Sequence, residues 1–293
     1  MTVRAPALIA LLPALALLAA CSPDAGSSSA PASSAAPASS ARPASEAPPV
    51  SSLPQSSAPP SGTPPSSEPP SSAPASSAPA SSSPSPAVFT HNPPGQLQAG
   101  GSGIADATIY VPGMRFPIQQ PNAFAQSQVW GHGGMSGPPG SQCDAPDYSY
   151  PWSDNFCEPR TYATVLCPAG TGHQGQDIRP NSCKAAIYQT AAAESGTICQ
   201  IGTYTVYLCS DTGRTYLYLH QQMNQLLVHV GDKVTRGQPL GLVSNNFGSS
   251  LTTIHLHFEI KEPVTYHGAT VTTWVPPYPS LVDAYQRMLN GTP

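Results

Sequence analysis

The segment from Ser22 to about Pro86 consists almost entirely of Pro, Ala and Ser, and it limits where the rest of the chain can fold. It has no apolar periodicity, so no buried core could offset the conformational entropy lost on folding. We therefore expect a disordered linker over residues 21–88. As a flexible coil, roughly 65 residues would span about 45 Å, and as extended polyproline they could approach about 200 Å.

Residues 1–20 have the composition of an export signal. A short start with Arg4 leads into an apolar, Ala-rich run that is too short to span a membrane as a helix. The run ends in Leu-Ala-Ala directly before Cys21, an arrangement that resembles the lipobox of bacterial lipoproteins, in which this Cys is acylated. We therefore expect a lipoprotein signal peptide over residues 1–20 and lipidation of Cys21. An ordinary cleaved signal followed by an incidental Cys is the alternative.

The residue after this cysteine bears on the choice of membrane. Ser22 follows Cys21, so no Asp stands there to hold a lipoprotein at an inner membrane. In a Gram-negative cell we expect an exported protein with a lipid anchor in the outer membrane, facing the periplasm, with the linker reaching towards the cell wall. The net charge of −4 and the lack of a basic cluster argue against nucleic acid as a partner.

The remaining residues, 89–293, are enough for one folded domain with its own core. All cysteines other than Cys21 lie in this part, and an even number in an exported domain indicates disulfide bonds. A structural zinc site is the alternative, but no CxxC pair is present and the spacings are wide. The cysteines are Cys143, Cys157, Cys167, Cys183, Cys199 and Cys209.

The connectivity of these cysteines is open, since six cysteines allow about 15 pairings. We expect each cysteine to pair with its neighbour in the sequence. Cys199 and Cys209 flank a turn signal at Gly202-Thr203, so a disulfide between them could bridge two adjacent strands.

The periodicity of the domain is that of β-strands. Residues 203–209 and 214–220 are rich in β-branched and aromatic residues, and the Ser-Asp-Thr-Gly between them predicts a hairpin. In the second run Tyr216, Tyr218 and His220 would share one face. Short strands with Gly-rich turns follow between residues 231 and 243.

These patterns predict a mainly β domain, with an antiparallel two-layer or barrel-like arrangement. Residues 112–172 are rich in Gly, Pro and Asn without a sustained period, which predicts long loops. Residues 281–289 have helical spacing of apolar residues, and Ser280 is the expected N-cap of this short C-terminal helix.

The segment HLHFEI at residues 255–260 is the expected last core strand. Alternate side chains of a strand point to opposite faces, so His255, His257 and Glu259 would share one face. A second motif, TGHQGQDIRP, carries His173 and Asp177. Two imidazoles with one carboxylate form a frequent ligand set of catalytic zinc, which keeps an open fourth position. Taken alone, an HxH motif on a strand is as often a hydrogen-bonded surface feature as a metal site.

Together the motifs resemble those of the lysostaphin-like, or LytM-type, zinc peptidases that cut peptide bonds in peptidoglycan. The similarity covers residues 172–260, in the order of the family's motifs, and it says nothing about residues 22–110. The matching positions are His173, Gly175 and Asp177 for HxGxD, Tyr218 and His220 for Tyr-x-His, Gly231, Val234, Gly237, Gln238 and Gly241 for the glycine motif, and His255 to Glu259 for HLHFE.

The resemblance implies a role for each histidine. His173, Asp177 and His257 would bind one Zn²⁺, while His220 and His255 would stay off the metal. Metal-activated water would attack the peptide bond, with His220 and His255 as acid and base. The resemblance implies a structural role for Glu259.

Two further residues are candidates for the substrate groove. His132 lies in a Gly-rich loop, and Tyr218 belongs to the Tyr-x-His motif. A hydrogen-bonding or core role is the alternative for Tyr218. The segment 112–172 departs from the family's usual sequence, and we expect it to form a wall of the groove.

Three functions are compatible with these motifs. The first is a zinc metalloendopeptidase that hydrolyses peptidoglycan cross-links or stem peptides. The second is a non-catalytic LytM-type lipoprotein that activates a cell-wall amidase or meets another division partner. The third is an anchor that only binds peptidoglycan. The enzyme is favoured because a binding module would not need the complete set of candidate ligands and acid/base residues. These are His173, Asp177, His220, His255 and His257.

Overall fold

A computed structural model describes residues 88–293 of the chain. The expected signal peptide, Cys21 and all of the linker up to residue 87 lie outside the described residues. None of the helices within the described part has the length and apolar character needed to cross a bilayer.

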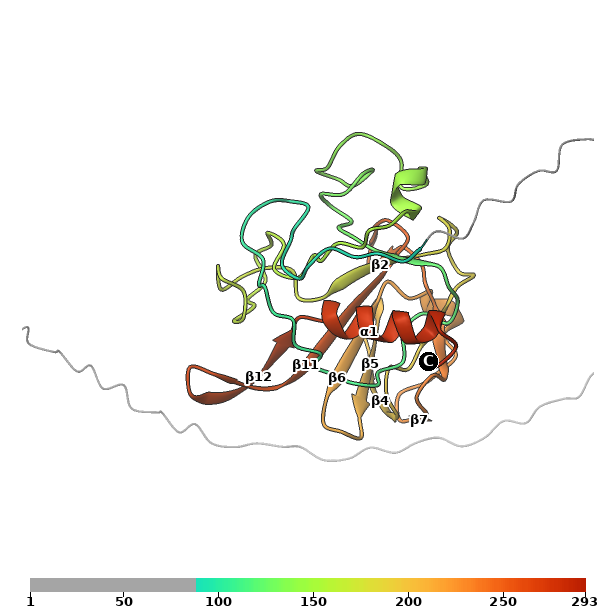
Figure 1. Cartoon of the computed structure of the whole chain (residues 1–293). Coiled ribbons are helices and arrows are strands. Elements are labelled where there is room, and N and C mark those ends of the chain that lie inside the picture. Colours follow the sequence, from blue (N-terminus) through green and yellow to red (C-terminus); the bar gives the residue numbers. More distant parts are fainter. Residues whose placement is uncertain (1–87) are drawn as a thin grey trace, which may run out of the picture. The chain divides into compact units, whose positions relative to one another are not determined.

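The described residues form a mainly antiparallel β structure around one large sheet, in the strand order β1-β2-β11-β6-β5-β4-β7, with β12 paired to β11 (Figure 1). Two smaller sheets pair β3 with β8 and β9 with β10. The strands are β1 Ala123–Ala125, β2 Gln176–Pro180, β3 Gln189–Ala191, β4 Gly196–Ile201, β5 Thr205–Ser210, β6 Thr215–Leu219, β7 Lys233–Val234, β8 Pro239–Leu242, β9 Asn246–Phe247, β10 Ser250–Leu251, β11 Leu256–Tyr266 and β12 Ala269–Val275. Two short 3₁₀ helices, η1 Ala145–Tyr148 and η2 Met223–Gln225, and one α-helix, α1 Tyr278–Leu289, complete the domain.

The predicted hairpin is confirmed, since β5 and β6 pair with Cys209 opposite Thr215. The HLHFEI segment opens β11, but the expectation that it is the last strand is wrong. β11 continues to Tyr266, turns at His267-Gly268, where both residues have positive φ, and pairs with β12 along its outer half. The β-branched residues of ATVTTWV account for the extra strand.

The C-terminal helix is confirmed, but its start differs from the prediction. It begins at Tyr278 after Pro277, and Ser280 is not its cap. Ser280 is fully buried, and its Oγ accepts a hydrogen bond from the backbone N–H of Val111 at 3.1 Å. The apolar side of α1 packs on the core across one face of the sheet, and the hydroxyl of Tyr285 accepts the N–H of Ala123 in β1 at 3.0 Å (Figure 1).

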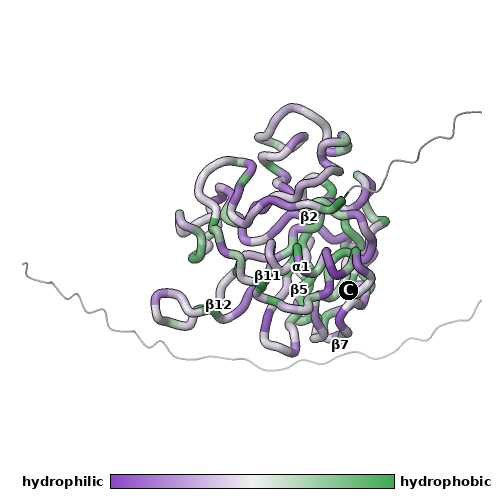
Figure 2. Tube along the Cα trace, in the orientation of Figure 1, coloured by the Kyte–Doolittle hydropathy of each residue, from purple (hydrophilic) through white to green (hydrophobic). Residues whose placement is uncertain are grey.

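The hydrophobic core lies between the large sheet, α1 and the long N-terminal loops. Residues 112–172 are largely irregular, as predicted, apart from β1 and η1. Their apolar side chains nevertheless enter the core, where Trp152 packs at 4.5 Å between ring centroids from Tyr285. Hydrophobic stretches follow the central strands, whereas the outer loops are mostly pale or purple (Figure 2).

All six cysteines of the domain form disulfide bonds, which confirms that part of the prediction. Consecutive cysteines are paired in Cys199–Cys209, which joins β4 to β5, and in Cys157–Cys167. Cys143 instead bonds to Cys183 across this second pair, so pairing in strict chain order is wrong for these four cysteines. The observed disulfides are Cys143–Cys183, Cys157–Cys167 and Cys199–Cys209.

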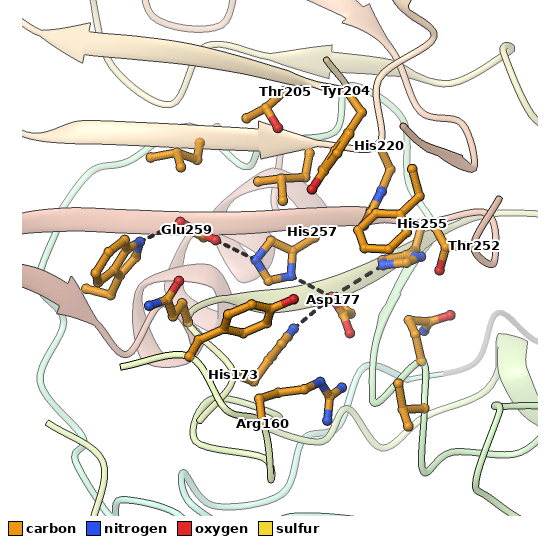
Figure 3. Close-up of a pocket in the computed structure, with 18 of the residues that line it drawn as sticks. Arg160, His173, Asp177, Tyr204, Thr205, His220, Thr252, His255, His257 and Glu259 are labelled. Carbon is orange, nitrogen blue, oxygen red and sulfur yellow. Dashed lines mark hydrogen bonds and ion pairs between the residues drawn. The ribbon is translucent and has the colours of Figure 1, made fainter. Parts of the chain in front are cut away.

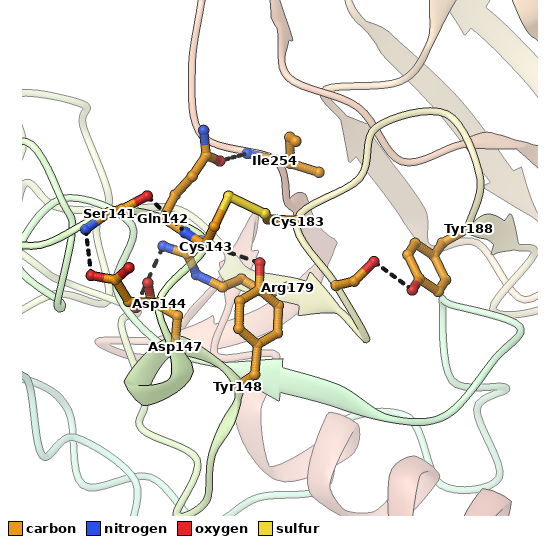
Figure 4. Close-up of a disulfide and its surroundings, with 11 residues drawn as sticks. Ser141, Gln142, Cys143, Asp144, Asp147, Tyr148, Arg179, Cys183, Tyr188 and Ile254 are labelled. Carbon is orange, nitrogen blue, oxygen red and sulfur yellow. Dashed lines mark hydrogen bonds and ion pairs between the residues drawn. A yellow bond between two sulfur atoms is a disulfide. The ribbon is translucent and has the colours of Figure 1, made fainter.

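The error has a structural cause near the end of β2. The loop before η1 folds back onto this strand, where Arg179 donates from Nη1 to the carbonyl oxygen of Gln142 at 2.9 Å (Figure 4). This contact brings Cys143 beside Cys183, 40 residues away in the sequence.

Candidate metal centre

The register between two strands creates the centre of the site. His257 of β11 stands directly opposite Asp177 of β2. The Oδ1 atom of Asp177 lies 2.9 Å from Nδ1 of His257 and 3.4 Å from Nε2 of His173, which precedes β2. The three side chains are buried, and one ligand atom from each lies within 4.8 Å of the others. Figure 3 shows the rings turned towards Asp177.

The glycine of the HxGxD motif allows this close approach. A Cβ atom on Gly175 would lie 2.5 Å from the carbonyl oxygen of Phe258 and 2.9 Å from Nε2 of His257. Any other residue at this position would therefore force β2 and β11 apart.

Asp177 is held by a neighbour that the sequence did not reveal. Its Oδ2 atom accepts a hydrogen bond from Nδ2 of Asn155 at 2.7 Å, and its backbone N–H donates to Oδ1 of Asn155 at 3.1 Å. Burial alone would raise the pKa of Asp177, but the facing imidazoles of His173 and His255 hold this pKa well below its usual value. The carboxylate therefore remains ionised in the folded protein.

In His173 and His257, the ring nitrogen that points away from Asp177 also makes a hydrogen bond. Nδ1 of His173 lies 3.0 Å from the carbonyl oxygen of Asn155, and Nε2 of His257 lies 2.9 Å from Oε1 of Glu259. Since a carbonyl or carboxylate oxygen only accepts, each of these nitrogens carries the proton. The opposite nitrogen of each ring faces Oδ1 of Asp177, where a metal ion would take the place of a proton, as in metal-ligating histidines.

Two more histidines lie on the other side of this group. Nε2 of His255 is 3.4 Å from Oδ1 of Asp177, and its Nδ1 is 2.9 Å from the carbonyl oxygen of Thr253. Nδ1 of His220 lies 2.8 Å from the carbonyl oxygen of Asn246, and the ring centroids of His220 and His255 are 4.5 Å apart. Burial, followed by the neighbouring His255, lowers the pKa of His220 to about 2. His220 is therefore a neutral imidazole at physiological pH.

A comparison with models of protein families shows to which family the site-bearing segment belongs. Residues 171–271 match the model of peptidase family M23. This segment is an M23 peptidase domain. The resemblance to LytM-type peptidases found in the sequence is thereby confirmed. No curated protein matches the chain significantly.

Several solved structures resemble the chain. A candidate glycyl-glycine endopeptidase lytM from Ruminococcus gnavus is 18% identical, with 59% of this chain and 61% of that chain covered and a TM-score of 0.37. The catalytic domain of the antimicrobial peptidase lysostaphin from Staphylococcus simulans is 24% identical, with 44% and 93% covered and a TM-score of 0.31. A zinc-containing peptidase from Vibrio cholerae is 24% identical, with 34% and 29% covered and a TM-score of 0.26. The chain thus spans less than two thirds of the Ruminococcus protein.

The centre of the M23 domain fits a metal ion. Burial lowers the pKa of His257, but its hydrogen bonds to Asp177 and Glu259 outweigh this effect and raise the pKa to about 9. The pocket therefore favours a positive charge between these groups. Zn²⁺ accepts this mixed nitrogen and oxygen donor set from three protein residues. His173, Asp177 and His257 are the residues that would hold it.

A cavity of about 540 Å³ opens over the centre of the M23 domain (Figure 3). Apolar and aromatic side chains form most of its walls, and several of them, such as Met135, Tyr162 and Phe247, are largely exposed at its rim. Tyr204 stands parallel to His220 with 5.8 Å between ring centroids. The lining residues are Gln128, Val129, Met135, Arg160, Tyr162, His173, Gln174, Asp177, Tyr204, Thr205, Tyr207, Leu217, Leu219, His220, Phe247, Thr252, His255, His257, Glu259 and Trp274.

The two residues predicted for the groove do not line this cavity. Tyr218 is fully buried in the core, and its hydroxyl accepts the N–H of Ala193 at 2.8 Å. His132 is turned to Asp144, with Nε2 3.0 Å from the carboxylate. The expectation that segment 112–172 forms one wall holds through other residues, among them Arg160.

The predicted common face of Tyr216, Tyr218 and His220 is also wrong. The two tyrosines point into the core, whereas His220 lines the cavity together with Leu217 and Leu219. His220 follows the last residue of β6 and has a φ of 63°. This left-handed backbone breaks the alternation of the strand and turns the imidazole to the other face.

A hydrogen bond joins the loop held by the Cys143–Cys183 disulfide to the residue before His255. Oε1 of Gln142 accepts the backbone N–H of Ile254 at 2.8 Å (Figure 4). Gln142 is adjacent to Cys143, whose bond to Cys183 fixes the loop to the end of β2. The position of His255 is therefore coupled to this disulfide, a link that the sequence did not indicate.

Proposed function

We propose that this chain is a zinc-dependent endopeptidase that hydrolyses peptide bonds in peptidoglycan cross-links or stem peptides. The observation that carries the proposal is the pairing of a buried His-Asp-His group with two additional imidazoles beside an open cavity. The M23 family match supports the peptidase chemistry. We further propose that the domain works from a lipid anchor at Cys21 in the outer membrane.

The side chains divide the chemistry between them. Zn²⁺ would supply Lewis-acid chemistry there, activating a water and polarising the carbonyl of the peptide. His173, Asp177 and His257 would hold the ion, while Glu259 and Asn155 keep the ligands in the required tautomer and orientation.

His220 and His255 would move protons. Nδ1 of His220 donates to the carbonyl oxygen of Asn246, which leaves the lone pair of the neutral ring on Nε2. Such a nitrogen can accept a proton from water or donate a hydrogen bond once protonated. Nε2 of His255 faces Asp177 from the same side. We propose that the two rings share the work of general base and of stabilising the departing amine.

The test is hydrolysis of purified cross-linked muropeptides by the full chain, followed by mass spectrometry. The proposal expects new amino and carboxyl termini with the wild type. His220→Ala and His255→Ala should keep their zinc but lose about a hundredfold or more in turnover. Stimulation of a cell-wall amidase by a wild type that cleaves nothing would instead assign the chain a regulatory role.

A further inference from the structure

The loop that follows Cys157 carries a charged residue into the cavity of the M23 domain. Cys157 and Cys167 close this loop by a disulfide, and both are buried. Its base is bonded to the first residue of the metal centre: Cys157 donates its N–H to the carbonyl oxygen of His173 at 3.0 Å, and His173 donates to that of Glu158 at 2.9 Å. The loop is therefore fixed relative to the centre.

Arg160 is the charged residue of this loop that lines the cavity. Its Nη2 atom donates to Oε2 of Glu158 at 2.9 Å, and Nη1 donates to the carbonyl oxygen of Pro159 at 2.7 Å. The carboxylate of Glu158 is fully buried, whereas 19% of the Arg160 side chain is exposed. A buried carboxylate thus holds one edge of the guanidinium, and its other N–H groups bond to no described side chain.

The charges around the cavity favour an anionic ligand. Among the described residues that line it, Arg160 is the only Lys or Arg. The two carboxylates of the lining are already engaged, Asp177 by Asn155 and the histidines, and Glu259 by His257 and by Nε1 of Trp274 at 2.5 Å. Neither is free to neutralise a substrate cation. Arg160 and His173 both line this cavity, and Figure 3 labels both among its lining residues.

We infer that Arg160 is a specificity residue that binds a carboxylate of the peptide substrate. A guanidinium matches a carboxylate with two parallel N–H···O bonds, and such charge-assisted bonds are stronger than neutral ones. The mostly apolar walls contribute contact area but no other Lys or Arg, so the position of this carboxylate would fix the peptide in the cavity. The inference rests on the proposed function, since it assumes that a peptide occupies this cavity.

The experiment compares muropeptides that carry free carboxylates with the same muropeptides converted to carboxamides by carbodiimide and ammonia. The zinc-loaded full chain should show a value of kcat/KM about ten- to hundredfold higher for the free acids. Arg160→Gln should abolish this preference, mainly through a higher KM. Arg160→Lys should keep part of it, because the charge remains without the planar fork. Arg236→Gln, which changes an exposed arginine outside the cavity lining, is the matched control and should behave as the wild type.

Equilibrium binding of the same two ligands gives a second measurement that does not depend on turnover. The zinc-loaded His255→Ala variant, which should bind but barely cleave, is compared with the same variant carrying Arg160→Gln; their calorimetric Kd values should differ for the acids and agree for the amides. Attraction of carboxylates to zinc is common to both proteins and cancels in this comparison. An equal loss for acids and amides would overturn the inference, as would an unchanged preference in Arg160→Gln. If nothing is hydrolysed, the proposed function fails, while the ratio of Kd values still decides the role of Arg160.

Discussion

Replacing Asn155 by Ala should weaken zinc binding although Asn155 is not a ligand. Its side chain makes two hydrogen bonds to Asp177, one at 2.7 Å to the carboxylate and one at 3.1 Å from the backbone N–H. Both groups of Asp177 are buried, so the substitution leaves two polar groups without their partner. Each such group costs about 1–3 kcal/mol of folding free energy. We expect a stability loss of about 2–6 kcal/mol and a zinc affinity reduced about 10- to 100-fold, the usual effect of removing a residue that orients a ligand.

The assay is competition for zinc against a chromophoric chelator, with urea unfolding of the same samples. Asn92→Ala is the matched control, since Asn92 donates to Oγ of Ser153 at 3.1 Å and touches no residue of the metal centre. This control should lose about 1 kcal/mol of stability and keep the zinc affinity of the wild type. A zinc Kd of Asn155→Ala within twofold of the wild-type value would show that Asn155 does not orient Asp177 for the metal.

Three further changes separate the roles of other residues. By metal analysis, Asp177→Ala should lose its zinc, whereas His255→Ala should retain most of it. The reverse result would make His255 a ligand and exclude Asp177 as one. Replacing Cys143 and Cys183 together by Ser removes a cross-link between residues 40 apart, which should cost about 4 kcal/mol in urea unfolding and lower turnover while zinc content is kept. Unchanged turnover would show that the adjacent loop does not position the catalytic groups. Cys21→Ala should release the protein from membranes, and a variant that still sediments with them would exclude the lipid as the main tether.

The grouping of His173, Asp177 and His257 was predictable because these residues lie in short motifs whose spacing reflects local geometry. His173 and Asp177 flank a glycine that β11 needs for close approach, and His257 belongs to a strand whose alternation is visible in the sequence. The hairpin of β5 and β6 was predictable for the same reason, since turn and strand signals are local.

The parts that were missed depend on contacts between distant segments. Asn155 and Arg160 lie in a segment without periodicity. Asn155 reaches Asp177 from just before Cys157, and Arg160 reaches the cavity from the loop that Cys157 and Cys167 close. The pairing of Cys143 with Cys183 follows from the loop docking on β2, which no local pattern encodes. His220 was assigned to the wrong face because a positive φ at one residue reverses the direction of a side chain.

Zinc titration of the metal-free full chain, with peptide hydrolysis measured at each step, is the decisive experiment for a zinc-dependent endopeptidase. We expect no cleavage of cross-linked muropeptides without metal and a linear rise that ends at one zinc per chain. Asp177→Ala should stay inactive throughout the titration. A zinc-dependent endopeptidase is excluded if cleavage survives complete removal of zinc, or if the chain binds one zinc and leaves every peptide bond intact.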